Sequence, residues 1–403
     1  MNIESAQQKL ALTSRPFRRF LYGSFFVRTA DWMDLTILNW VVYEWTGSGV
    51  ALGMVNACRL LPVFLFSVSA GLVADNYNRR QSLLILYGGM LLSTISVGII
   101  IGQQASFLLL LMAITIRSVF MSYEVPIRNA WLSDIVPGRM LGSAITLQTT
   151  SINVARMIGP ALAGVLLGYF PAGGIILGVS LGILIVLFSL MTISGHQQKI
   201  QERGQWEKKS FHETIQYLKG QPVLLALLFV AIAPMIFGFP YTTMLPIFSK
   251  ELMGLGPAGF GFLLSVSSLG AIGATGLLTF QQPVLGGRWL IISSLAFGTS
   301  LIFFTLMSRF YWAAIGLMFI VGFTSQYYRT MSRVLLQLKV ADEFRGRVLA
   351  IALMDRGYIP LGAILIGWVA SSFNAFTAGL LMGIGTILFT IVVVRSNRSL
   401  WKE

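Results

Sequence analysis

Ionisable side chains recur inside stretches of this chain that are otherwise apolar enough for a lipid bilayer. Arg28, Asp31 and Asp34 follow at intervals of three, which places them along one face of a helix. A charge at membrane depth costs about 2.5–3.5 kcal/mol on insertion scales, so such groups are paired, hydrated or functional. A carboxylate whose surroundings alternate between dry and wet can load and release a proton. We therefore predict that Asp31 and Asp34 carry protons, with Asp34, the one farther from Arg28, as first choice.

Further charges lie within the other apolar stretches. They are Arg59, Arg117, Arg156, Asp355 and Arg356. One interpretation is that these groups only form neutralised pairs that orient helices, as Arg28 could with Asp31. The alternative is a polar central cavity, in which the fixed charge of Arg117 tunes a carboxylate or a substrate anion. Residues that could add hydrogen bonds or an aromatic wall to this cavity are Asn39, Asn153, Tyr241, Gln326 and Tyr327.

Glu124 and Arg128 lie near the end of the apolar run that contains Arg117. We interpret them, together with Asp134, as ion pairs of a gate. The competing interpretation is that they are solvated charges at the membrane surface.

The whole composition indicates a membrane protein. Of 403 residues, 55% are hydrophobic and 11% charged, and the mean hydropathy is +0.76, whereas soluble domains carry about a quarter of charged residues. Twelve apolar runs are each long enough to cross about 30 Å of hydrocarbon as a helix. They cover residues 17–43, 50–74, 81–102, 106–125, 142–168, 173–194, 222–249, 258–281, 288–307, 311–333, 345–371 and 375–395. The predicted fold is an all-α integral membrane protein with twelve transmembrane helices.

The distribution of basic residues predicts the orientation. The net charge is +14, but outside the spans only Lys250 and Arg309 fall on the odd-numbered loops. Basic residues in short loops stay on the cytoplasmic side, so both termini are predicted to be cytoplasmic, and the charge reflects topology and anionic lipid headgroups, with no nucleic-acid partner. The polar stretch 194–221 is a predicted cytoplasmic linker between six-helix bundles at 1–193 and 222–403.

Several chemistries have no support in the sequence. The chain lacks a Gly-x-x-x-x-Gly-Lys-(Ser/Thr) phosphate loop, and no nucleophile stands beside a base, so we predict neither an ATPase nor another enzyme. His196 and His212 are isolated residues of the linker, and Cys58 is a single cysteine, so we expect no metal, cofactor or disulfide. Energy for any transport would come from an ion gradient.

A short polar turn, Gly71-Leu-Val-Ala-Asp-Asn-Tyr-Asn-Arg-Arg80, separates the second and third apolar runs. It resembles the loop between the second and third helices of major facilitator superfamily transporters, which usually reads Gly-x-Leu-Ala-Asp-(Arg/Lys)-x-Gly-Arg-(Arg/Lys). Asn78 replaces the family's glycine, and because Asn tolerates a left-handed backbone we expect a mild change. The resemblance implies that Asp75, placed just before the third helix, acts with Arg79 and Arg80 in gating.

The fifth apolar run contains Gly159-Pro160-Ala-Leu-Ala-Gly164. This segment is similar to the Gly-Pro motif of antiporters in the superfamily, which favours export in exchange for protons. A plain packing site is the alternative, since glycines allow close helix approach and Pro160 removes one backbone hydrogen bond.

A narrower resemblance, to the bacterial branch of enterobactin-type siderophore exporters and macrolide efflux proteins, rests on five segments. They are Tyr43–Ser48, Gly71–Arg80, Ile116–Ser118, Val136-Pro137 and Arg156–Pro160. It implies the major facilitator fold, function as a monomer and export of a small molecule across the bacterial cytoplasmic membrane. The excess of arginines over buried acids favours an anionic catecholate-like substrate. A multidrug or macrolide pump, a lysophospholipid flippase, a proton-driven importer and a transporter-like receptor or scaffold are alternatives.

Overall fold

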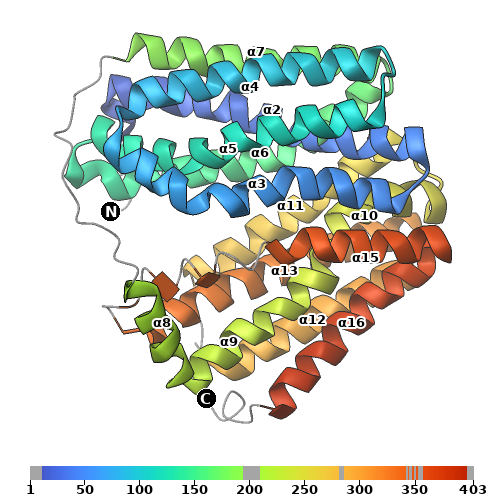
Figure 1. The fold of residues 1–403 in the computed structure, drawn as a ribbon. Coiled ribbons are helices and arrows are strands. Elements are labelled where there is room, and N and C mark those ends of the chain that lie inside the picture. Colours follow the sequence, from blue (N-terminus) through green and yellow to red (C-terminus); the bar gives the residue numbers. More distant parts are fainter. Residues whose placement is uncertain are drawn as a thin grey trace. The chain divides into compact units, whose positions relative to one another are not determined.

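The computed structural model describes residues 11–193, 209–280, 286–341, 344, 347–348, 351–352 and 357–396, without the side chains of 67, 68, 75, 139, 209–212 and 280. Its elements in these ranges are helices (Figure 1). The chain divides into two compact units, the first formed by 1–41 and 58–203, the second by 42–57 and 204–403.

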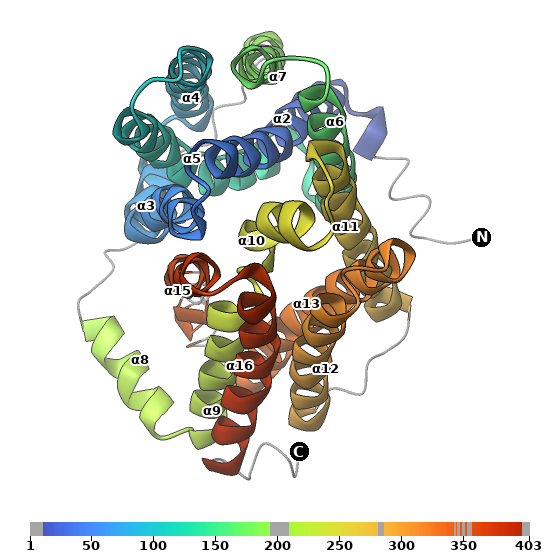
Figure 2. The ribbon, with the colours of Figure 1, turned by 90° about the vertical axis from the view of Figure 1, so that its right-hand side faces the viewer.

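The first unit is a bundle of long helices. They are α2 (Arg15–Thr46), α3 (Gly49–Asn76), α4 (Arg79–Gly102), α5 (Phe107–Ile135), the short turn η1 (Gly138–Met140), α6 (Leu141–Leu167) and α7 (Ala172–Thr192). The end of α2 and the start of α3, within residues 42–57, belong to the second unit. Figure 2 views this bundle nearly end-on and shows α2 between α5 and α6. Local sequence sets the helix ends: Gly47, with φ of 57°, stops α2, and the Asn78 side chain caps α4 by accepting the Gln81 N–H.

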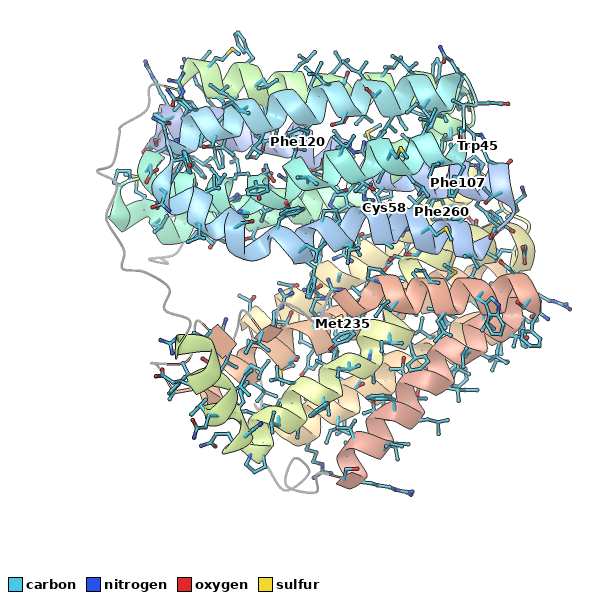
Figure 3. All side chains as sticks on the ribbon, viewed as in Figure 1. Trp45, Cys58, Phe107, Phe120, Met235 and Phe260 are labelled. Carbon is cyan, nitrogen blue, oxygen red and sulfur yellow. The ribbon has the colours of Figure 1, made fainter. Side chains whose placement is uncertain are left out.

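The first unit is held together by close backbone approach and by large buried side chains. A Cβ added at Gly173 of α7 would lie 2.7 Å from Cα of Gly102 in α4. A Cβ added at Gly89 of α4 would lie 2.6 Å from the ring of Phe120 in α5 (Figure 3). Phe20 of α2 packs edge-on against Trp131 of α5, with ring centroids 5.5 Å apart. The last contact positions α2 against α5, which carries Arg117, Glu124 and Arg128.

The second unit contains a further set of helices. They are α8 (Lys209–Lys219), α9 (Pro222–Ala233), η2 (Pro234–Gly238), α10 (Tyr241–Ile247), η3 (Phe248–Leu252), α11 (Pro257–Phe280), α12 (Gly287–Leu306), α13 (Tyr311–Lys339), α15 (Tyr358–Ser372) and α16 (Ala375–Ser396). Close packing again uses glycine: a Cβ at Gly322 of α13 would lie 1.9 Å from the carbonyl oxygen of Ser267 in α11. The apolar stretch 222–252 is not one regular α-helix, since the π-helical segments η2 and η3 flank α10 next to Pro234, Pro240 and Pro246.

Nine helices in the described ranges are long and apolar enough to cross a membrane. Three predicted spans are not among them. Charged residues interrupt α2, polar and basic residues fill the second half of α13, and the described part of α15 has 15 residues. The number of twelve spans and the cytoplasmic termini therefore stay predictions.

Gly159 fixes the distance between α6 and α2. A Cβ at this position would lie 2.7 Å from Cβ of Trp32 and 2.9 Å from the carbonyl oxygen of Thr29. Helix α6 continues through the neighbouring Pro160 to Leu167, and both Gly159 and Pro160 are buried. The tight-packing part of the sequence interpretation agrees with this geometry.

We expect Gly159→Ala to lower the stability of the purified protein, because α2 must move away from α6 to admit the methyl group. Overpacking of this kind costs about 1–3 kcal/mol. The matched control is Gly142→Ala in the same helix, where an added Cβ meets nothing within 4 Å. Thermal unfolding in detergent should separate the two variants, and equal midpoints would show that the α2–α6 contact is not a tight one.

Candidate functional site

Asp34 of α2 is buried between two arginines from other helices. Arg117 of α5 donates from Nη1 to Oδ1 at 2.8 Å and from Nη2 to Oδ2 at 2.7 Å. Arg59 of α3 donates from Nη1 to the same Oδ2 at 2.8 Å. Only 5% of the Asp34 side chain is exposed. Bidentate and charge-assisted bonds of this kind are strong, so Asp34 is held by two guanidinium groups from different helices.

Asp31, one turn earlier on α2, has a different environment. Its Oδ2 accepts one bond from Arg28 Nη1 at 2.8 Å, as the spacing predicted. The second terminal nitrogen of Arg28 donates to Glu124 Oε1 on α5, so Asp31 shares its counter-charge with another acid. The Asp31 side chain is 18% exposed, against 1% for Glu124. Of the three buried acids, Asp31 is the one with a single shared arginine and the greatest access to solvent.

Glu124 is the centre of the second half of this network. Tyr87 of α4 donates its hydroxyl to Oε1 at 2.6 Å, and Arg128 Nε lies 2.8 Å from the same oxygen. Glu124 and Arg128 are both buried within the first unit. The interpretation as solvated surface charges is therefore wrong: α5 continues to Ile135, so Glu124 lies well inside the helix.

A small cavity connects the two acids. It measures about 10 Å³ and lies between α2, α4, α5 and α7. Asp31, Asp34 and Arg117 line it together with apolar residues such as Met90 and Val179. This volume is close to the minimum for one water molecule, and three charged side chains would provide its partners. The space can thus place a proton donor or acceptor beside both carboxylates.

Arg156 of α6 adds a further positive charge next to the same helix. Its guanidinium carbon lies 5.3 Å from the ring centroid of Trp32, over the ring, in a cation–π contact. Trp32 is the residue against which Gly159 packs. With Arg156 included, five arginines accompany three acids in this part of the first unit. They are Arg28, Arg59, Arg117, Arg128 and Arg156, with Asp31, Asp34 and Glu124.

A role in the central cavity stays a prediction for Asn39, Asn153 and Tyr241, whose local surroundings differ. Asn39 is buried on α2 and Asn153 is half-buried on α6. Tyr241 of the second unit is 2% exposed, bonds Ser267 Oγ at 2.7 Å and packs edge-on against Phe297. Tyr241 is therefore packed inside the second unit.

The last four residues of the prediction divide into two pairs. Gln326 Nε2 donates to Thr330 Oγ1 at 3.3 Å, and Tyr327 stacks on Phe323. Asp355 and Arg356 lie outside the described residues. A role in substrate binding stays a prediction for all four.

The polar turn between α3 and α4 differs from its predicted geometry. Asp75 belongs to the last turns of α3, and its side chain lies outside the description, whereas the residue at the start of α4 is Asn78. Asn78 caps that helix with φ of −62°, so the left-handed conformation that Asn tolerates is not used here. An N-cap needs an extended residue with a side-chain acceptor, which Asn supplies and Gly does not.

The two arginines of the turn have separate partners. Arg79 bonds Asp134 of α5 at 2.7 Å and the carbonyl oxygen of Ala74 at 2.9 Å, so it ties the turn to α5. Arg80 instead donates to the carbonyl oxygens of Leu190 and Met191 at the end of α7. Helix ends leave carbonyl groups unpaired, and Arg80 satisfies two of them. A gating role stays a prediction for both arginines, and Arg80 also caps the end of α7.

The sequence analysis did not identify Tyr87 as a site residue, and it assigned Glu124 to a gate and not to the group of proton-coupling residues. A signal for Glu124 existed, because Arg117, Glu124 and Arg128 stand at i, i+7 and i+11 and thus on one helix face. Tyr87 gave none, since a tyrosine in an apolar helix is usually a packing residue.

The chain is similar to known membrane transport proteins over nearly its whole length. The family model described as "Transmembrane secretion effector" matches residues 10–403. The staphyloferrin A transporter of Staphylococcus aureus (strain NCTC 8325 / PS 47) is 31% identical over 391 residues, covering 94% of this chain and 96% of that protein. Macrolide efflux protein A of Streptococcus pyogenes is 22% identical, covering 87% and 88%. A solved bacterial homologue of the human lysosomal transporter Spinster aligns with a TM-score of 0.75 at 16% identity, covering 96% and 98%, which shows a shared fold.

Proposed function

Because the chain belongs to the transmembrane secretion effector family of major facilitator transporters, we propose that it is a proton-coupled exporter of an anionic siderophore. The observation that carries the proposal is the buried network of the first unit. It holds an excess of arginines around acids, one of which is open enough to exchange a proton. A fixed positive excess at membrane depth favours an anionic partner.

The choice of substrate rests on charge and on similarity together. The relative named for staphyloferrin A is similar over nearly the whole chain, which supports a siderophore. The similarity to macrolide efflux protein A is weaker and favours a second candidate, a drug exporter. Pumps for lipophilic cations rely on unpaired carboxylates, whereas every buried acid of this network is bonded to an arginine. We therefore place the anionic siderophore first and macrolide efflux second.

In the proposed cycle Asp31 is the proton carrier and Asp34 is a fixed counter-charge. This order reverses the expectation from the sequence, because Asp34 is held by two arginines and Asp31 by one that it shares. When Asp31 is protonated, its ion pair with Arg28 within α2 weakens. The ion pair between Arg28 and Glu124, which joins α2 to α5, remains. Protonation thus changes how α2 is held, and a conformational equilibrium can respond to it.

Electrostatics alone would favour binding of the anionic substrate when Asp31 is protonated, since the network then has a larger net positive charge. Exchange therefore depends on the conformational bias: protonation favours the state open to the cytoplasm, and ionised Asp31 favours the outward state that releases substrate. A membrane potential that is negative inside assists the exit of an anion.

The remaining elements of the proposal concern the whole chain. We propose twelve spans in six-helix bundles at 1–193 and 222–403, with the linker 194–221 and both termini in the cytoplasm. The protein is a monomer in a bacterial cytoplasmic membrane, and its partners are the substrate, protons and lipid.

Uptake into inside-out vesicles tests the function. We expect labelled staphyloferrin A or a catecholate siderophore to accumulate when the vesicle interior is acidic, and ethidium or a macrolide not to compete. Vesicles bearing the empty vector are the control. Uptake of the macrolide alone would assign the protein to drug efflux, and siderophore movement driven only by the opposite proton gradient would make it an importer.

A further inference from the structure

A second positively charged site lies at the start of α2, apart from the buried network. A hollow of about 390 Å³ is lined by Arg15, Arg18, Arg19 and Tyr22. The three arginines are exposed, and the first turn of α2 contains no acidic residue. Arg15, Arg18 and Tyr22 follow at intervals of three and four, so they share one helix face. In the described part of the chain, the structure records no ion pair for the Arg15 or Arg18 side chain.

Arg19 anchors this end of α2 to α7. Its Nη1 donates to the carbonyl oxygen of Thr192 at 2.8 Å, and Ser189 Oγ donates to the backbone carbonyl of Arg19 at 2.5 Å. A Cβ at Gly23 would lie 3.0 Å from Cβ of Ser189, so the two helices meet closely here. Helix α7 has no basic residue in its own last turn, and Arg19 acts there with Arg80. The position of the hollow is therefore fixed by bonds to a neighbouring helix.

Exposed apolar side chains on α7 and α2 indicate the level in the bilayer at which this end of α2 lies. Phe188 and Met191 of α7 are 70% and 61% exposed, and they end a stripe that also contains Leu181 and Leu184. This stripe stops at the level of the carbonyl groups that Arg19 and Arg80 cap. On α2, Tyr22 is 66% and Phe26 45% exposed. Tyrosine with an apolar neighbour on one side and basic groups on the other is typical of the boundary between hydrocarbon and headgroups.

We propose that this hollow binds the headgroup phosphate of an anionic phospholipid. Arg15 and Arg18 supply the guanidinium donors for the phosphate, Tyr22 lies at the glycerol level, and the acyl chains follow the exposed stripe of α7. Planar guanidinium groups recognise phosphate oxygens in pairs, which a lysine cluster does less well. The site rests on the proposed membrane placement of α2 and α7 and does not depend on which molecule is exported.

Native mass spectrometry of the full chain in detergent tests the site without any transport assay. Phosphatidylglycerol and phosphatidylcholine are titrated separately, and bound lipids are counted. We expect the first phosphatidylglycerol to bind at least about tenfold more tightly than phosphatidylcholine, and Arg15→Gln/Arg18→Gln to remove that difference. The matched control, Lys219→Gln/Arg395→Gln, removes two exposed charges elsewhere and should keep it.

Two results would overturn the assignment. If the arginine double variant binds phosphatidylglycerol as the control variant does, the hollow is not a lipid site. If millimolar inorganic phosphate displaces the lipid, the site recognises free anions. Size-exclusion profiles of all variants identify any that fail to fold, and Tyr22→Phe, which keeps the ring, should retain most of the binding. Siderophore uptake is measured in a separate assay, so the lipid-binding result can be interpreted even if the export proposal is wrong.

Discussion

Asp31→Asn should abolish the dependence of transport on a proton gradient while leaving the protein folded and able to exchange substrate. Asparagine cannot take up and release the proton, but its amide oxygen can still accept the bond from Arg28, which also keeps Glu124. Replacing a charged acceptor by a neutral one at this partly exposed position costs about 1 kcal/mol, because the bond itself remains. Gradient-driven siderophore uptake should fall at least about tenfold, since the coupling free energy is lost. Exchange of labelled for unlabelled substrate, without any gradient, should persist.

The separation of these two assays is what makes the prediction specific to coupling. A variant that damages the substrate site loses exchange as well as driven uptake, whereas a coupling variant loses only the latter. Asp31→Glu is the companion variant, because it restores a titratable group and should recover part of the driven uptake. Full gradient-driven uptake by Asp31→Asn would remove Asp31 from the proposed cycle.

Asp34→Asn should be far more damaging to the structure itself. It leaves Arg59 and Arg117 buried with no carboxylate between them, and removing one partner of a buried ion pair costs about 3–5 kcal/mol. We expect poor yield, a lower unfolding midpoint in detergent and no exchange of substrate. The measurement is fluorescence-detected thermal unfolding of the detergent-solubilised variants.

A double variant shows whether charge is the cause. Arg117→Gln on the Asp34→Asn background removes one of the two unpaired guanidinium groups, so part of the stability should return. Arg117→Gln alone leaves Asp34 with Arg59 and should be milder than Asp34→Asn. If the double variant is less stable than Asp34→Asn, the arginine stabilises the bundle by packing and not through Asp34.

The sequence predicts which residues share a helix face better than it predicts where a helix ends or what it packs against. The three-residue spacing predicted correctly that Arg28 and Asp31 meet, because helix geometry alone decides that contact. The partner of Arg28 on α5 could not be predicted, since it depends on how two helices pack. Glu124 was placed at a gate because hydropathy falls after residue 125, while the helix continues to Ile135.

The partners of the residues in the polar turn were also only partly predictable from the sequence. Its motif predicted a charged connection, and Arg79 indeed bonds Asp134. Asp75, expected just before the third helix, belongs to the end of α3, and only backbone geometry shows that Asn78 is the N-cap of α4. Likewise, Arg80 was grouped with Arg79, although its partners are carbonyl groups of α7 more than a hundred residues away.

Proton flux driven by substrate is the most direct test of the account. Purified protein is reconstituted into liposomes that contain a pH-sensitive dye, and a siderophore gradient is imposed with no initial pH difference and with the membrane potential clamped. The account predicts that siderophore movement in one direction drives protons in the other for the wild type, and drives none for Asp31→Asn. Siderophore flux without any proton movement in the wild type, or proton movement in the same direction as the siderophore, would contradict it.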